Sequence, residues 1–191
     1  MTTANDLNLT PSGMRQSTSL SDTAASISAD SNAYTTDRDP EDINEDAIDT
    51  LNDLLESCRD GEYGFRECAE HTKAQDIKTV LGQRAEDCRM AAVDLQALIV
   101  KMGGEPEEGG TASGALHRGW VSVKGTLTGY SDYAMLDECE RGEDVALANY
   151  RKALKQALPS AARALVEKQS QGAQRNHDQI KAMRDALKVS A

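Results

Sequence analysis

The sequence predicts an all-α protein in which four long helices form a bundle. Residues that favour helices, chiefly Ala, Leu, Glu, Asp, Arg and Lys, dominate from about residue 41 onward. The chain has only 4 prolines in 191 residues, so little interrupts a long helix. Four long segments repeat apolar residues at steps of three and four, which is the spacing of an amphipathic helix.

The charge of the chain excludes two classes of partner. The formal net charge is -11 and the pI is about 4.7, and such an acidic surface repels nucleic-acid backbones and anionic membranes. No segment approaches the roughly 18 apolar residues of a membrane span, and the N-terminus lacks the basic and apolar regions of a secretory signal. We therefore expect a cytoplasmic protein with reduced thiols that binds neither nucleic acid nor a membrane.

Residues 1–40 differ in composition from the rest of the chain. They are rich in Ser, Thr, Asn and Asp, and their apolar residues follow no sustained period. Because so few apolar side chains cannot form a core, we predict a disordered Ser/Thr-rich tail that could bind another protein. The folded domain is then expected over residues 41–191.

The first two helices are expected over residues 42–72 and 75–102, joined by a short turn. The first begins just after a proline, with acidic residues in its first turn, as the helix dipole favours. The second ends at a Gly-Gly pair, which is typical of a helix C-cap. Each apolar stripe contains one charged residue, which is Glu62 in the first helix and Arg84 in the second.

The last two helices are expected over residues 131–158 and 160–188. Pro159 marks a tight turn between them, at or near the first position of the final helix. The two hairpins are separated by a polar, glycine-rich loop over residues 105–113 and a short helix over residues 115–127.

The segment between the hairpins is long enough to travel the length of the bundle, at about 1.5 Å per helical residue and about 3.3 Å per extended one. The second and third helices then run parallel, which is the ferritin-like arrangement rather than a simple up-down-up-down bundle. Within the segment, His117-Arg-Gly-Trp120 could bind a ligand. We favour the interpretation that Trp120 anchors the short helix to the bundle.

Acidic residues occupy the apolar stripe of the third helix. If the apolar stripe continues through residues 137–144 with the same spacing, it passes through Glu140 and through Glu143 or Asp144. Counting outward from the two turns places Glu62 level with Arg84, and Glu140 level with His177. Because an unpaired buried charge is very costly, these residues predict one polar layer whose members are partners of each other.

The polar layer has two interpretations. Glu62, Glu140, Glu143 and His177 could bind a metal, since carboxylate and imidazole together suit iron, manganese or zinc. Alternatively, Glu62 pairs with Arg84 and Glu140 pairs with His177 in a buried ionic network. The network is favoured, because a guanidinium group in the layer neutralises a carboxylate and repels a metal ion.

Two other pairs of residues are candidate sites. Glu67 and His71 lie four residues apart on one helix face and could chelate a metal, although a solvated face is the simpler interpretation. Cys58 and Cys88 lie at one level and could form a redox pair, although helix-interior cysteines are more often small buried apolar residues. The remaining cysteines, Cys68 and Cys139, have no predicted partner.

Five short motifs together resemble a known family: Asp60-Gly-Glu-Tyr-Gly-Phe65, Gly103-Gly-Glu-Pro106, His117-Arg-Gly-Trp120, Glu140-Arg-Gly-Glu-Asp144 and His177. The family comprises uncharacterised bacterial four-helix-bundle proteins, a domain-of-unknown-function family placed in the ferritin-like superfamily. The resemblance covers about residues 43–188 and implies this fold, with a relation to stress or metal handling. In the wider superfamily, two metals are bound by Glu from two helices and Glu-x-x-His from the other two. This chain departs from that pattern, because Gln174 stands at the Glu position before His177.

The sequence contains no phosphate-binding glycine loop, nucleophile elbow or Walker motif. The predicted function is therefore a non-enzymatic, ferritin-like bundle protein that is a dimer or larger homo-oligomer and is associated with stress. The alternative is an iron- or manganese-binding ferritin-like protein with oxidase or storage-type chemistry. A third hypothesis is a module that binds a protein partner through the tail.

Overall fold

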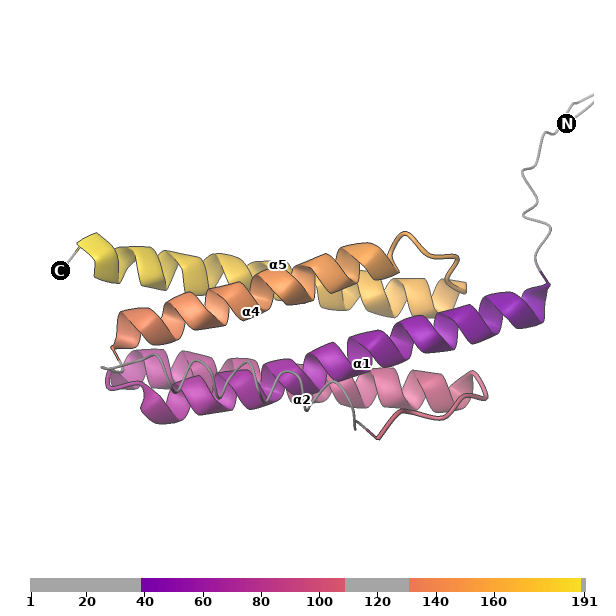
Figure 1. Cartoon of the computed structure of the whole chain (residues 1–191), viewed down its shortest axis with the longest axis horizontal. Helices are drawn as coiled ribbons and strands as arrows, with labels where there is room; N and C mark the ends of the chain where they lie inside the picture. Colours follow the sequence, from indigo (N-terminus) through magenta and orange to yellow (C-terminus); the bar gives the residue numbers. More distant parts are fainter. Residues whose placement is uncertain (1–38, 109–130, 190–191) are drawn as a thin grey trace, which may run out of the picture. The chain divides into compact units, whose positions relative to one another are not determined.

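The computed structural model describes residues 39–108 and 131–189, which form four helices and no strand. The helices are α1 (Pro40–His71), α2 (Gln75–Lys101), α4 (Asp132–Ala153) and α5 (Ser160–Val189), and they belong to one compact unit (Figure 1). The predicted all-α four-helix bundle is confirmed. The tail up to residue 38 and the short helix predicted over residues 115–127 lie outside the described residues. Within the described ranges, no helix is both long and apolar enough to cross a bilayer.

The ends of the first hairpin follow the predicted capping chemistry. The Asp39 side chain caps α1 by accepting a hydrogen bond from the backbone N–H of Glu41 (3.0 Å). At the end of α2, Gly103 adopts φ +85° and its N–H donates to the carbonyl of Val100 (3.0 Å). Residue 104 in turn donates to the carbonyl of residue 99 (3.0 Å). These bonds form a Schellman motif, which explains why a Gly-Gly pair ends this helix.

The prediction that the third helix continues to residue 158 is wrong, because α4 ends at Ala153. The guanidinium group of Arg163 donates to the backbone carbonyls of Leu154 (3.2 Å) and Gln156 (2.9 Å), which are left free at the helix end. The residue before Pro159 is also disfavoured in helical conformation. The connection to α5 therefore needs several non-helical residues.

The helix order around the bundle is that of a ferritin-like protein. α1 packs against α2 and α4, and α5 packs against α4 and, least closely, against α2. The Asp132 carboxylate at the start of α4 accepts hydrogen bonds from the backbone N–H groups of Lys73 (2.6 Å) and Ala74 (3.0 Å). α4 thus begins at the α1–α2 turn, runs parallel to α2 and requires the predicted long crossover.

The first described residues of the crossover run along α1. Asn52 on α1 donates to the carbonyl of Glu105 (3.2 Å) and accepts from the N–H of Glu107 (2.9 Å). Arg59, about two helical turns beyond Asn52 on α1, donates to the carbonyl of Glu107. The crossover therefore leaves α2 in the direction of the α1–α2 turn, which is where α4 begins.

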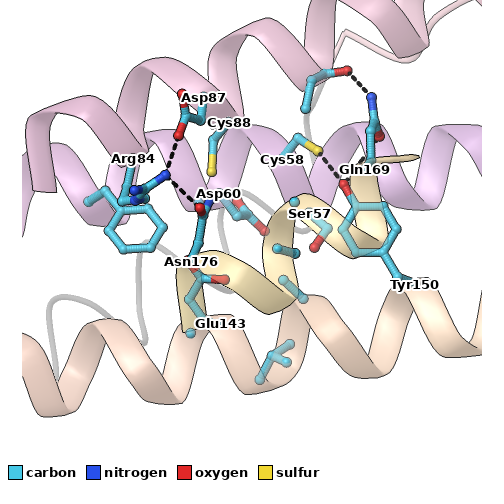
Figure 2. A pocket seen from close by; sticks show the side chains of 18 of the residues that line it. Ser57, Cys58, Asp60, Arg84, Asp87, Cys88, Glu143, Tyr150, Gln169 and Asn176 are labelled. Atoms are coloured by element: carbon cyan, nitrogen blue, oxygen red, sulfur yellow. Dashed lines mark hydrogen bonds and ion pairs between the residues drawn. The ribbon is translucent and has the colours of Figure 1, made fainter. Parts of the chain in front are cut away.

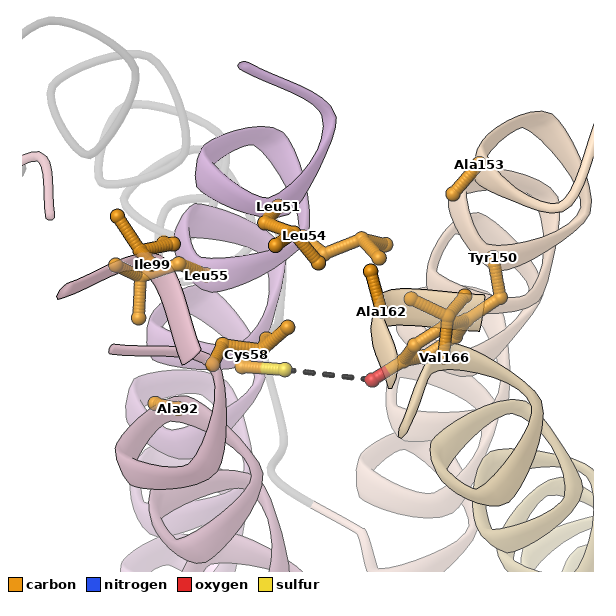
Figure 3. Close-up of a cluster of buried hydrophobic side chains, with 11 residues drawn as sticks. Leu51, Leu54, Leu55, Cys58, Ala92, Ile99, Tyr150, Ala153, Ala162 and Val166 are labelled. Atoms are coloured by element: carbon orange, nitrogen blue, oxygen red, sulfur yellow. Dashed lines mark hydrogen bonds between the residues drawn. The ribbon is translucent and has the colours of Figure 1, made fainter. Parts of the chain in front are cut away.

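Two apolar clusters fill the bundle and leave a layer between them. One cluster is centred on Leu51, Leu54, Leu55, Leu95, Ile99 and Val166 (Figure 3). The other is centred on Phe65, Leu81, Leu136 and Ile180. Fully burying such a side chain contributes about 1.5–3 kcal/mol. Glu62, Glu140, Glu143 and His177 lie on segments between the two clusters. Arg84 instead lies between Leu81 and Ala85, which belong to the second cluster.

We expect Gly104→Ala to destabilise the protein, because a methyl group there would lie 2.7 Å from Cγ2 of Ile48 on α1. Overpacking of this kind costs on the order of 1–3 kcal/mol. Gly82→Ala is the matched control, since nothing lies within 4 Å of a methyl group at Gly82 in the middle of α2. That control should gain about 1 kcal/mol from helix propensity. Urea unfolding measures both, and a neutral Gly104→Ala would contradict the packing of the crossover on α1.

Candidate functional site

A cavity of about 850 Å³ lies in the middle of the bundle and is lined by all four helices (Figure 2). Glycines contribute to its wall on three helices, namely Gly61 and Gly64 on α1, Gly142 on α4 and Gly172 on α5. Because glycine has no side chain, it leaves space between helices that an apolar side chain would otherwise fill. Gly61 also permits close contact between α1 and α2, since a methyl group there would lie 3.0 Å from Sγ of Cys88.

Glu143 on α4 is the most deeply buried carboxylate of the cavity wall, with only 4% of its surface exposed. Burial raises the pKa of its carboxyl to about 8; Arg84 lowers this pKa in part, whereas Asp87 and Asp144 raise it. No described residue donates a hydrogen bond to it. Gln174, on the facing helix α5, is exposed and donates to Asp178 (2.9 Å). Glu143 is therefore mostly protonated at neutral pH.

Asp60 presents a second carboxylate to the cavity from α1. Burial, and to a lesser extent the neighbouring Glu56, raises the pKa of this carboxyl to about 6. Figure 2 shows Asp60 and Glu143 pointing from different helices toward the same space. The sequence predicted Glu143 in the polar layer but gave no signal for Asp60, because Asp60 lies beside the apolar stripe of its helix and not on it.

Arg84 connects α2 to α5 across one side of the cavity. Its guanidinium group donates to Asp87 on its own helix (2.5 Å) and to Asn176 (2.5 Å) and Gln179 (2.7 Å) on α5. The predicted ion pair between Glu62 and Arg84 is therefore wrong among the described residues. Glu62 instead pairs with Arg66, one turn along α1. An i,i+4 partner on the same helix face satisfies Glu62 without crossing the bundle.

Glu140 is buried, as predicted, but its main partner is Arg184 on α5, which contacts it as an ion pair. His177 lies farther away, with Nε2 4.0 Å from Oε1 of Glu140. The same nitrogen is 3.2 Å from Asp144, and Nδ1 is 3.2 Å from Asp178. The pair of Glu140 with Arg184 was not predicted, because the sequence prediction paired only residues that lie equally far from the turn between their helices. Arg184 lies two turns beyond His177, and helix side chains tilt toward the N-terminus, which directs it back toward Glu140.

The four predicted metal ligands are distributed among separate partners. Glu62 pairs with Arg66, Glu140 with Arg184, and His177 with two aspartates. Over residues 39–108 and 131–189, no group of three or more His, Cys, Asp or Glu side chains is arranged to hold a metal ion. Because cations already neutralise two of the predicted carboxylate ligands, these residues do not fit a di-metal centre. The other pair, Glu67 and His71, is half-buried, and His71 donates to the Glu67 backbone carbonyl (2.8 Å).

The four cysteines are free and lie in two places. Sγ of Cys58 is 3.4 Å from the hydroxyl of Tyr150 in the cavity wall, and burial raises the pKa of the Cys58 thiol to about 11. Cys88 is close enough to Cys58 for a charge on Cys58 to raise its own pKa, although burial raises it more. Cys139 makes a side-chain hydrogen bond with Cys68, a contact between α4 and α1 that the sequence analysis did not predict.

Comparison with known proteins extends these observations. A family model described as "Domain of unknown function (DUF2383)" matches residues 46–156. No curated protein matches the sequence. A mutant of Dps1 from Mycobacterium smegmatis has a similar structure, with a TM-score of 0.64 at 14% identity over 75% of this chain and 98% of that one. The dodecameric thioferritin, a bacterioferritin-related protein from Bacteroides fragilis, gives a TM-score of 0.59 at 14% identity over 77% and 90%. At this identity the likeness concerns the fold.

Replacing Glu143 with glutamine should make the protein more stable at alkaline pH. The folded-state pKa of about 8 lies above the ordinary glutamate value of 4.5. The folded protein therefore holds an extra proton between these pH values, and stability falls as pH rises from about 4.5 to about 8. Glu143→Gln should remove this fall, because a neutral amide does not ionise. Urea unfolding at pH 5, 7 and 9 measures the effect, and parallel curves for both proteins would contradict it.

Proposed function

The chain belongs to the DUF2383 family, and on this premise we propose a non-enzymatic, ferritin-like bundle protein whose buried charges hold the helices in register. The observation that supports this most directly is the ion pair between Glu140 on α4 and Arg184 on α5. A buried carboxylate has a low energy only beside its cation, so a shift of α5 along α4 would leave it unpaired. Arg84 has the same effect between α2 and α5.

We further propose that the protein is a homo-oligomer, a dimer or larger. The name of the Bacteroides fragilis protein describes a dodecamer, which supports assembly in proteins of this fold. On α2, Met90, Val93 and Val100 are exposed apolar side chains at positions three and seven residues apart, which is one helix face. An apolar helix face of this kind is typical of a contact between protein surfaces.

The proposal also includes a division of the chain into a Ser/Thr-rich tail over residues 1–40 and a bundle domain over residues 41–191. The cytoplasmic location, the association with stress and a protein partner for the tail remain predictions. The acidic charge of the chain supports the expectation that neither nucleic acid nor an anionic membrane is a partner.

Iron or manganese binding is the second candidate function. His177 lies 3.2 Å from Asp144 and 4.0 Å from Glu140, so these are the potential ligands nearest to each other between α4 and α5. They would have to rearrange to bind a metal ion, because they form no metal-binding group in the described residues. The likeness to a thioferritin related to bacterioferritin supports iron as a candidate metal. A metal ion at this place would have to displace Arg184 from Glu140, because the two cations would compete for one carboxylate.

We expect Arg184→Met to lower the free energy of unfolding, because the buried carboxylate of Glu140 then has no cation beside it. The loss should be smaller than for a fully buried pair, because the Arg184 side chain is 20% exposed. Arg141→Met is the control, since Arg141 is 66% exposed and its pair with Glu138 should contribute less than about 1 kcal/mol. Adding Glu140→Gln to Arg184→Met should restore most of the loss. Equal losses in Arg184→Met and Arg141→Met would argue against a register role.

Metal content distinguishes the two candidate functions. The untagged full chain is loaded aerobically with Fe²⁺, desalted and analysed by mass spectrometry. If the buried charges are structural, we expect no stoichiometric iron. One or two irons per chain, lost in His177→Ala and kept in His71→Ala, would support the metal-binding alternative and overturn the first proposal.

A further inference from the structure

The buried carboxylate of Glu143 has no role in the ion pairs that connect the helices. Among the three predicted carboxylate ligands, it alone has no cationic or imidazole partner at contact distance in the described part of the chain. Only 4% of its surface is exposed, and it borders the cavity. A buried carboxylate that borders a half-open cavity and accepts no hydrogen bond has a lower energy when a cationic or donor group enters that cavity.

The charges around the cavity favour a cation. Carboxylates outnumber Lys and Arg side chains in its wall. Among the cations, Arg84 is engaged by Asp87, Arg141 by Glu138, and Lys168 lies 4.0 Å from Asp94. The remaining cation, Arg175, is exposed on α5. Glu143, Asp60 and Glu56 are therefore the carboxylates of the wall that no described cation contacts, and Glu143 is the most deeply buried of them.

The rest of the wall favours an organic body on that cation. Phe65, Met90, Val145, Ala146 and Tyr150 present hydrocarbon and aromatic surface to the space. A metal ion needs several oxygen or nitrogen ligands at one point, which this wall does not offer. The volume of about 850 Å³ falls in the range of roughly 300–1,000 Å³ that is usual for small-molecule sites.

We propose that the cavity binds an organic monoamine, with its ammonium group at Glu143 and its hydrocarbon body against the apolar wall around Phe65 and Tyr150. Asp60 faces the same space from α1 and offers the second acceptor for the ammonium N–H groups.

The site makes binding depend on pH in a defined direction. The charged groups around Glu143 are Arg84 and Asp87 on α2, Asp60 on α1, Arg175 on α5 and Asp144 on α4. The free protein holds a proton on Glu143 at pH 7, because the pKa of its carboxyl is about 8. The ammonium group favours the ionised carboxylate, so binding releases this proton and becomes tighter as pH rises toward 8. Above about pH 10 the amine itself loses its charge.

Isothermal titration calorimetry of the full chain tests the proposal with 4-phenylbutylamine as the probe and 4-phenylbutan-1-ol as its neutral counterpart. We expect the amine to bind at least tenfold more tightly than the alcohol at pH 8. The affinity for the amine should rise several-fold between pH 6.5 and pH 8, with a proton released that is detected by comparing buffers of different ionisation enthalpy. Equal affinity for amine and alcohol, or no binding of the amine, would overturn the proposal.

The variant Glu143→Gln should lose at least tenfold in affinity for the amine and lose the pH dependence and the proton release. Glu167→Gln is the matched control, because it makes the same substitution at an exposed residue of α5 that does not border the cavity. It should retain affinity within about twofold. Circular dichroism checks that both variants fold, and Asp60→Asn provides a second, independent loss of affinity. Unchanged binding in Glu143→Gln and Asp60→Asn would overturn the site, whatever the result of iron loading.

Discussion

The structure depends on how the two carboxylates that α4 buries between the apolar clusters are stabilised. α4 places Glu140 and Glu143 on its buried face, less than one turn apart. Arg184 from α5 neutralises Glu140, which fixes how α5 lies against α4. Glu143 has no such cation and borders a space that the glycines of three helices leave open. One buried charge thus contributes to the packing of the helices, whereas the other remains available in a half-open cavity between them.

Much of the fold could be predicted because its signals are local. The period of apolar residues, the Gly-Gly C-cap and Pro159 are read from neighbouring residues, and the length of the crossover sets the order of the helices. The end of α4 was missed because Arg163, which accounts for the free carbonyls there, is ten residues from Ala153 and acts through its side chain. The Asn52 contacts with the crossover are likewise tertiary and have no signal in the local pattern.

The site could be predicted only in part, because counting residues from a turn gives height along a bundle and not direction around a helix. It placed Glu140 and Glu143 correctly in the interior. It paired Glu62 with Arg84, although Glu62 has a partner on its own helix and Arg84 reaches α5. It also ignored side-chain length, which allows Arg184 to contact Glu140 from two turns beyond the expected partner. The fold itself does not decide the chemistry of such a layer, which depends on these individual contacts.

The least closely packed interface of the bundle, between α2 and α5, has a consequence for motion. There Arg84 replaces apolar packing with hydrogen bonds to Asn176 and Gln179. Water can substitute for such bonds at little cost, whereas it cannot substitute for contacts between leucines. Fluctuations that separate two helices without unfolding either should therefore occur first at this interface. The backbone amides of α2 and α5 that face each other should then exchange with solvent through local opening, at a lower free energy than global unfolding.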